Sequence, residues 1–253
     1  MSLQATRRTF AIATSCLFLG ARPTAAQVNN KGATESLYEG VLGTSLIGMT
    51  LSQPRGGQGQ VTGHYFYGKV LKDIALSGSL QSGRLMLKEP GGGTFALEFV
   101  GNGSGEPGKP LDFGNSIGLT GTWTLGGKRL EVTLGNTANR VVGGRRYEQI
   151  TNESDEAFEA RVQGFHTAVL AGDRVAAAGF VQYPLRVNAA GKSRQIASAE
   201  QFQAAWDQIF TAACLDALKE SLPHDMFVSK GQAMIGNGVA WFGPKGAAVI
   251  NIP

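Results

Sequence analysis

The first half of the chain alternates apolar and polar positions with a period of two, the period of side chains along a β-strand. The alternation comes in short segments, separated by clusters rich in glycine, serine and proline that favour turns. We predict strands at residues 37–42, 46–52, 61–67, 74–80, 84–88, 95–100, 117–125 and 130–134. Because most of the connections are short, neighbouring strands are expected to pair antiparallel, as in a meander.

Three of these segments, "VTGHYF", "LSGSL" and "LTGTWTL", place Gly63, Gly78 and Gly121 midway along an apolar face. Glycine in a flat strand costs about 0.5–1 kcal/mol relative to alanine. In a coiled strand, however, the missing Cβ on the concave side lets the sheet bend. We therefore expect residues 33–142 to form an all-β antiparallel small barrel of about eight strands. Two packed sheets with glycines at bulges are the alternative.

After residues 143–153, which we take as a linker, the hydrophobic period changes from about two to about 3.6. We expect residues 154–253 to form an α+β cone in which helices pack on a curved antiparallel sheet. The predicted helices start near Ser154, at Asp173 and at Ser198, and the third is a long helix that ends before Pro223. The predicted strands are 185–188, 226–229, 232–242 and 247–252.

The N-terminus has the order of an export signal: a basic start, an apolar stretch at residues 10–21 and the small residues 24–26. Cleavage near Ala26 would leave Gln27 first, and we expect the mature protein in the periplasm or outside the cell. The segment Thr6-Arg7-Arg8-Thr9-Phe10 resembles the twin-arginine signal. The twin-arginine route and the general secretory route both remain open.

Charge and cysteine content narrow the classes of partner. The whole chain has a formal net charge of +4, but without residues 1–26 there are 23 − 3 = 20 basic and 19 acidic residues, a net charge of +1. A nearly neutral chain has no field to attract nucleic acid, and no later apolar run reaches the roughly 20 residues that span a bilayer. Cys214 would be the only thiol after cleavage, so we expect no intramolecular disulfide.

Two resemblances extend this picture. Tyr38-Glu39-Gly40 and the three glycine segments resemble a β-rich module of secreted bacterial proteins, a module without assigned function. The stretches "FHTAVLAGDRVAAAGFVQYPLRV", "SAEQFQAAWDQIF", "GQAMIGNGVAWFG" and "AAVINI" resemble the nuclear transport factor 2 and ketosteroid isomerase-like superfamily. The second resemblance implies a sheet wrapped around the long helix, with a pocket at the wide end of the cone. That superfamily includes isomerases, hydratases, binding proteins and dimerisation modules, so the resemblance does not determine function.

Few residues suggest chemistry. The chain contains no His-Glu-x-x-His motif, and its histidines are far apart in sequence, so we expect no metal and no cofactor. His64 is expected on the solvated outer face of the barrel, and His224 in a loop. The candidate catalytic residues are His166, at the edge of an apolar helix face, and Asp207. The candidate pocket residues are Tyr183, Arg186, Trp206 and Trp241.

Three functions are compatible with these patterns. We favour an exported, non-catalytic binding or interaction protein whose partner is an unknown small molecule or protein. The first alternative is an isomerase or hydrolase for a small apolar molecule, with His166 or Asp207 as the base. The second is a dimerisation module, with a homodimer formed through the C-terminal domain. A cone pocket filled by Trp206 and Phe210 would count against catalysis.

Overall fold

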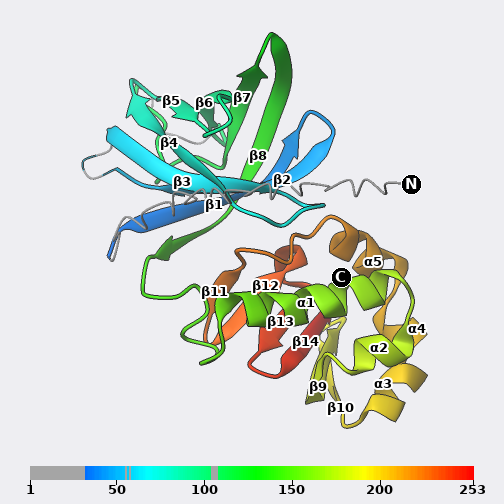
Figure 1. The fold of residues 1–253 in the computed structure, drawn as a ribbon. Coiled ribbons are helices and arrows are strands. Elements are labelled where there is room, and N and C mark those ends of the chain that lie inside the picture. The colour runs from blue at the N-terminus through cyan, green and yellow to red at the C-terminus, as the bar shows by residue number, and fades with distance from the viewer. Residues whose placement is uncertain (1–31, 55, 57, 104–107) are drawn as a thin grey trace, which may run out of the picture.

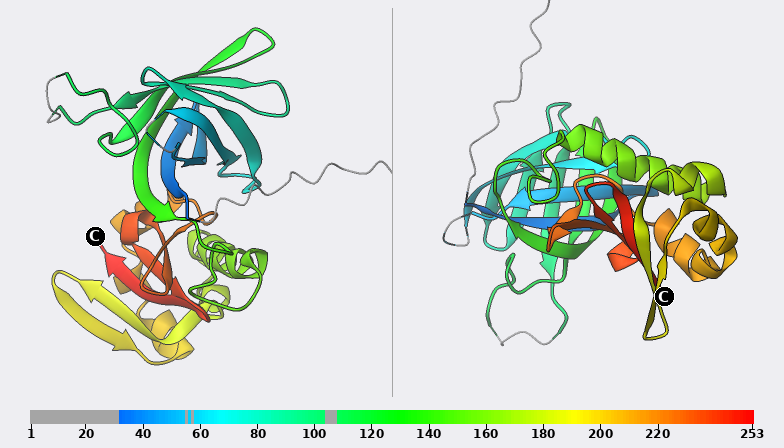
Figure 2. Two further views of the ribbon diagram at one scale, coloured as in Figure 1. Left: turned by 90° about the vertical axis from the view of Figure 1, so that its left-hand side faces the viewer. Right: turned by 90° about the horizontal axis from the view of Figure 1, so that it is seen from below.

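The computed structural model describes residues 32–54, 56, 58–103 and 108–253. The predicted export signal at residues 1–26 therefore lies outside the described residues. Within them the chain forms a closed barrel followed by a C-terminal region of short helices and one sheet (Figure 1). The two views of Figure 2 show the barrel on one side and the C-terminal region packed against its outer wall.

The barrel confirms the predicted architecture of the first half. Its strands are β1 (Thr34–Leu42), β2 (Ser45–Ser52), β3 (Gly59–Tyr67), β4 (Ile74–Gln81), β5 (Arg84–Lys88), β6 (Thr94–Val100), β7 (Gly118–Leu125) and β8 (Lys128–Val141). Each strand pairs antiparallel with the next along the chain, and β8 closes the barrel by pairing with β1. Alternate side chains fill the interior with an apolar core that includes Tyr65, Phe95 and Trp123.

The three glycines of the repeated segments lie inside strands, where neighbouring backbone leaves no room for a side chain. A Cβ on Gly63 would lie 2.0 Å from the carbonyl oxygen of Thr50 on β2. A Cβ on Gly78 would lie 1.8 Å from the carbonyl oxygen of Met86 on β5. Gly121, with a φ of +153°, meets the backbone of β6 in the same way. The glycines therefore permit the tight coiling that closes the barrel.

Strand β8 is longer than its apolar pattern predicts, 128–141 instead of 130–134. Its second half is polar, and its register with β1 shifts between Leu37 and Tyr38. The carbonyl oxygen of Leu37 accepts hydrogen bonds there from Asn136 Nδ2 (3.3 Å) and Thr137 Oγ1 (3.2 Å). Polar side chains thus stabilise the irregular pairing of β8 with β1. Hydrophobic alternation does not reveal this part of the strand, because its side chains are polar.

The C-terminal region contains a six-stranded sheet in the order β10-β9-β14-β13-β12-β11. The strands are β9 (Val181–Ala189), β10 (Lys192–Ile196), β11 (Phe227–Ser229), β12 (Gln232–Ile235), β13 (Ala240–Gly243) and β14 (Gly246–Ile252), with a 3-10 helix η1 (Gly236–Gly238) between β12 and β13. The prediction of a wholly antiparallel sheet is wrong, because β14 pairs parallel with β9. Sequence pattern alone does not show which distant strands become neighbours.

The predicted long helix is also wrong. The region has α1 (Asp155–Leu170), α2 (Arg174–Ala178), α3 (Ala199–Ala204), α4 (Trp206–Ile209) and α5 (Ala212–Lys219). The helical run breaks at Phe210, whose ψ of 67° is not helical, and Thr211 caps α5 by accepting a hydrogen bond from Cys214 N (3.3 Å). The apolar spacing continues across this break, so the pattern resembles one long helix.

The C-terminal region has an apolar core of its own, in which Phe165 of α1 packs against Phe242 of β13 (5.4 Å between ring centroids). Tyr147 and Ile150, which lie in the predicted linker at 143–153, are buried in the same core. The two apolar cores contain different residues and do not merge. The barrel and the C-terminal region therefore meet through other contacts, and these include several ion pairs.

Candidate functional site

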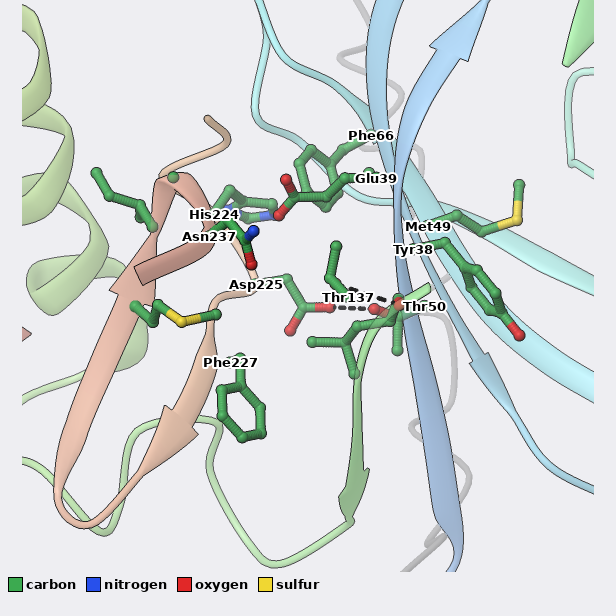
Figure 3. A pocket seen from close by; sticks show the side chains of 15 residues that line it. Tyr38, Glu39, Met49, Thr50, Phe66, Thr137, His224, Asp225, Phe227 and Asn237 are labelled. Carbon is green, nitrogen blue, oxygen red and sulfur yellow. Dashed lines mark hydrogen bonds between the residues drawn. The ribbon is translucent and has the colours of Figure 1, made fainter. Parts of the chain in front are cut away.

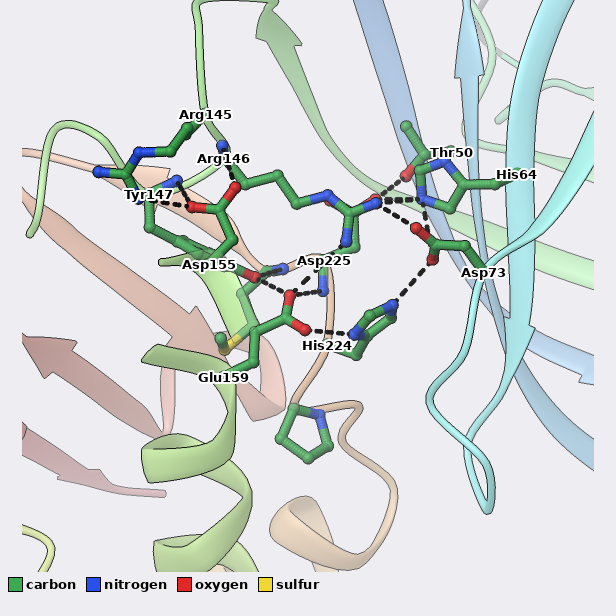
Figure 4. A network of polar contacts seen from close by, with 12 residues as sticks. Thr50, His64, Asp73, Arg145, Arg146, Tyr147, Asp155, Glu159, His224 and Asp225 are labelled. Atoms are coloured by element: carbon green, nitrogen blue, oxygen red, sulfur yellow. Dashed lines mark hydrogen bonds and ion pairs between the residues drawn. The ribbon is translucent and has the colours of Figure 1, made fainter. Parts of the chain in front are cut away.

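A network of charged side chains joins the barrel to the C-terminal region (Figure 4). The barrel supplies His64 from β3, Asp73 from the β3–β4 connection and Arg140 from β8. The C-terminal side supplies Arg146, Tyr147, Glu159, His224 and Asp225. None of the candidate residues chosen from the sequence belongs to this set.

Asp225 lies at the centre of the network, with a side chain that is 1% exposed. Its carboxylate accepts hydrogen bonds from Thr50 Oγ1, His64 Nε2 and Arg140 Nη1, each at 2.7 Å. Arg146 Nε lies 3.2 Å from the same carboxylate. Burial by itself would raise the pKa of Asp225, but the two arginines and His64 outweigh it and hold the pKa well below its usual value.

His224 connects two carboxylates that come from opposite sides of the interface. Its Nδ1 lies 2.5 Å from Glu159 Oε2 and its Nε2 lies 2.8 Å from Asp73 Oδ1. Burial would lower the pKa of His224, but its bonds to the two carboxylates outweigh this and raise the pKa to about 9. At neutral pH the ring is therefore protonated, and both N–H groups donate.

The remaining contacts complete the pairing of these charges. Glu159 Oε1 accepts from the Tyr147 hydroxyl (2.6 Å) and from the backbone N–H of Asp225 (3.0 Å). Asp73 accepts from Arg146 Nη2 (2.5 Å), and its pKa falls to about 2 because His224, His64 and Arg146 outweigh the effect of burial. In this network the hydrogen-bond donors and acceptors are paired with one another, so the side chains and the two regions are held in fixed orientations. The pairing leaves no obvious base or nucleophile free to react.

A small cavity borders the network and is lined by residues of both the barrel and the C-terminal region (Figure 3). It has a volume of about 70 Å³ and is lined by Glu39, Thr50, Phe66, His224 and Asp225 among others. Burial raises the pKa of Glu39 to about 7. The volume of the cavity is well below the range of about 300–1,000 Å³ that is typical of small-molecule sites.

A larger groove lies beside the network, between the barrel and the C-terminal region. Its barrel wall is formed by the β1–β2 turn and the β3–β4 connection, with Lys69, Val70 and Leu71. Its other wall is formed by α1 and the segment that follows α5, with His166 and Pro223. The groove encloses about 700 Å³, within the range of about 300–1,000 Å³ typical of small-molecule sites.

The network and the groove share their structural supports. Asp73 ends the connection that forms the barrel wall, and His224 directly follows Pro223 in the opposite wall, so their 2.8 Å contact ties the two walls together. The ring of Phe66 packs edge-on against His224, with 4.5 Å between centroids. The width of the groove is therefore fixed at one end by charged and aromatic contacts.

The two candidate catalytic residues are far from any shared site. His166 is half-buried, donates from Nε2 to the carbonyl oxygen of Leu218 (2.7 Å) and lines the groove, not the interior of the C-terminal region. Burial lowers its pKa, so the ring is neutral at pH 7. Asp207 is on the surface, with a side chain that is 80% exposed and pairs with Arg174 (2.7 Å). The structure does not bring these two groups together.

The four candidate pocket residues are likewise dispersed. Trp206 is buried and packs against Phe210 with 4.4 Å between ring centroids, so both rings fill the core of the C-terminal region. Arg186 is exposed on β9. The Tyr183 hydroxyl donates to Ala178 O (3.2 Å), and Trp241 Nε1 donates to Gly238 O (3.1 Å). As far as the structure describes the chain, none of these four residues lines the small cavity or the groove.

The residues of the network could not be recognised in the sequence, for a physical reason. His64 was expected on a solvated face, and it is indeed on the outer face of the barrel, but the C-terminal region covers it and leaves its side chain 16% exposed. His224 does lie in a loop, but it is buried. Asp225 and its partners are separated by up to 175 residues, so no local spacing could have indicated their contact.

Two kinds of site are absent from the residues that the structure describes. Among them, no group of three or more histidine, cysteine, aspartate or glutamate side chains is arranged to hold a metal ion. No helix within the same residues has the length and apolar character needed to cross a membrane.

Comparison with known proteins gives no match. No family model matches the chain, and no curated protein and no solved structure is significantly similar to it. Any assignment of function must therefore come from the geometry of the chain itself.

Proposed function

We propose that this chain is an exported, non-catalytic binding protein that holds a small molecule in the groove between the barrel and the C-terminal region. The observation that supports this best is the groove itself: about 700 Å³, lined by apolar and polar side chains, with walls that the Asp73–His224 contact ties together. A preformed site of this kind binds without a large cost of ordering.

The filling of the C-terminal core argues against the isomerase or hydrolase alternative. A substrate in the cone would need the space that Trp206, Phe210 and Phe165 occupy. The titratable groups of the network are paired with one another, whereas a general base needs a free lone pair within reach of its substrate. A binding protein needs neither a substrate pocket inside the C-terminal region nor a free general base.

The groove can be tested directly by filling it. Thr167 is exposed on α1 and lines the groove, so Thr167→Trp should block it with little effect on either apolar core. We expect two fluorescent probes of one aromatic skeleton, anilinonaphthalene sulfonate and uncharged phenylnaphthylamine, to report binding in titrations of the unmodified chain. Thr167→Trp should weaken binding of whichever probe binds by at least about tenfold, since a filled site loses its contacts.

The matched control is Thr124→Trp, which adds the same ring at an exposed position of β7, away from the groove. This variant should bind as the unmodified chain does. The proposal fails if neither probe binds, or if Thr167→Trp binds as tightly as the control.

Export and self-association complete the proposal. Export predicts that protein recovered from the periplasm or medium of its host begins near Gln27, and recovery of the intact chain from the cytoplasm would contradict it. A homodimer through the C-terminal region predicts a dimeric mass by light scattering at micromolar concentration. A monomer there would remove dimerisation while leaving the groove untouched.

A further inference from the structure

We infer that the ligand of the groove is a small organic anion with an apolar body, held at its charged end by Lys69 and Lys219. This inference rests on the proposed function and names the chemical class that the groove would select. It is drawn from the charge, the hydrogen-bonding groups and the apolar surface of the two walls.

The charged groups of the groove are of one sign. Lys69 on the barrel wall and Lys219 on the opposite wall line it, and no aspartate or glutamate is among the described residues that do so. Residues 27–253 contain 20 basic and 19 acidic residues, so their charges nearly cancel. A cavity with two lysines and no acid is more positive than the chain as a whole. Two ammonium groups facing one cavity attract an anion.

The two ammonium groups are available for a ligand. Lys219 pairs with Asp216 three residues earlier at 2.9 Å, but both side chains are more than 60% exposed. An exposed pair of this kind is worth little and yields to a better partner. Lys69 is exposed, and the described residues offer it no acidic partner.

The remainder of the lining suits an apolar body. Val70, Leu71 and Pro223 present aliphatic surface, and Val70 is 64% exposed. An apolar side chain left this open inside a concave surface gains free energy when a ligand covers it. His166 adds an acceptor: its Nε2–H bonds Leu218 O, so Nδ1 of the neutral ring keeps a lone pair that can accept from a ligand hydroxyl.

The two probes named above separate this inference from the proposed function, because one has a sulfonate and the other has no charge. The test variant is the full chain with Lys69→Gln and Lys219→Gln together. The control is Lys128→Gln with Lys192→Gln, which removes two exposed positive charges at the β7–β8 turn and the start of β10. Circular dichroism and thermal melting confirm that each variant is folded.

We expect the unmodified chain to bind the sulfonate more tightly than the uncharged probe, and added salt to weaken only the sulfonate. The double variant at 69 and 219 should lose roughly four- to 25-fold in sulfonate affinity, since exposed ion pairs contribute roughly two- to fivefold each. Its affinity for the uncharged probe should not change. The control at 128 and 192 should bind both probes as the unmodified chain does.

Three results would overturn the inference. Equal affinity for the two probes, with both lost in Thr167→Trp, would leave a binding protein without preference for anions. An equal loss of sulfonate affinity in the control variant would show a general charge effect and no site. Binding of neither probe would reject the groove and the proposed function with it.

Discussion

The barrel and the C-terminal region reach compact structures by different means. In the barrel every strand pairs with its neighbour along the chain, and only the β1–β8 contact that closes it is distant in sequence. In the C-terminal region β9 lies beside β14, and three short helices stand between β10 and β11. The barrel is therefore specified mainly by local alternation and glycines, whereas the C-terminal region depends on contacts between distant segments.

The interface between the barrel and the C-terminal region is stabilised differently from either region. Each region buries its own apolar core, and ion pairs made by Asp225 and His224 connect the two. Charged contacts are directional and are sensitive to pH, whereas apolar packing is neither. Variants can therefore perturb the interface, the barrel or the helical region separately, and the expected effects differ in size.

The largest effect should come from Asp225→Asn. Asparagine preserves the shape of the side chain and tolerates the φ of +46° at this position, but it removes the buried carboxylate that Arg140 and Arg146 share. Among the described residues, Arg140 then keeps only Glu35, and Arg146 keeps Asp73 and the more distant Glu159. Breaking a buried ion pair on one side costs about 3–5 kcal/mol, so we expect the free energy of unfolding to fall by about 4 kcal/mol. Urea denaturation monitored by circular dichroism measures the change.

The control for this variant is Asp216→Asn, which removes the exposed partner of Lys219. Its free energy of unfolding should change by less than about 1 kcal/mol, because an exposed pair contributes little. If the two variants were equally stable, Asp225 would not be the centre of the interface.

The second effect is on pH dependence. The pKa of His224 is raised to about 9 from 6.5, so its contribution is complete below pH 6.5 and is lost as the pH rises through 9. The free energy of unfolding should fall by about 3 kcal/mol over this window, since each pKa unit corresponds to about 1.4 kcal/mol. His224→Gln should remove this slope. Glu39, with a pKa raised to about 7, titrates in both proteins and cancels in the comparison.

A His224→Gln variant with an unchanged pH profile would show that other groups cause the slope. Urea denaturation at a series of pH values between neutrality and the pKa of His224 is sufficient to decide. The test concerns the interface, because the ring of His224 packs on Phe66, which belongs to neither apolar core.

The third effect concerns the coiling of the barrel. Gly78→Ala places a Cβ where the carbonyl oxygen of Met86 would be 1.8 Å away, and backbone cannot move as a flexible side chain can. We expect a loss of about 2 kcal/mol in thermal or urea unfolding, the usual cost of overpacking. Gly91→Ala is the control, since its nearest neighbour would be 3.8 Å away and its φ is not positive. An equal loss in both variants would refute the role given to Gly78.

The fold could be predicted from the sequence where local pattern is sufficient. The alternation and the mid-strand glycines predict a barrel of about eight strands, and the structure has such a barrel. The polar half of β8 was not predicted, because Asn136 and Thr137 donate hydrogen bonds to the backbone of a bulge. Such contacts do not appear in a hydrophobic pattern. The parallel β9–β14 pair escaped because strand neighbours that are distant in sequence leave no local trace.

The candidate site could be predicted only in part. His166, chosen for its position at the edge of a helix face, does line a cavity, although that cavity lies between the two regions and not within the second. Lys69 and Lys219 lie on different regions, so their juxtaposition requires the packed structure. Trp206 was placed in a pocket because an apolar stripe does not distinguish a lining residue from a core residue, and it belongs to the core.

The smallest expected effect is a change in the free energy of unfolding on Thr211→Ala. Its sign distinguishes the separate helices of the structure from the one long helix predicted from the sequence. If residues 198–222 formed one helix, Thr211→Ala would replace a weak helix former in the interior and stabilise the chain by about 0.5 kcal/mol. Because Thr211 instead caps α5 through Cys214 N, its removal should destabilise the chain by about 1 kcal/mol. Thr167→Ala, within α1, is the control and should be neutral or slightly stabilising. A stabilised Thr211→Ala would support the long helix, and with it the predicted cone.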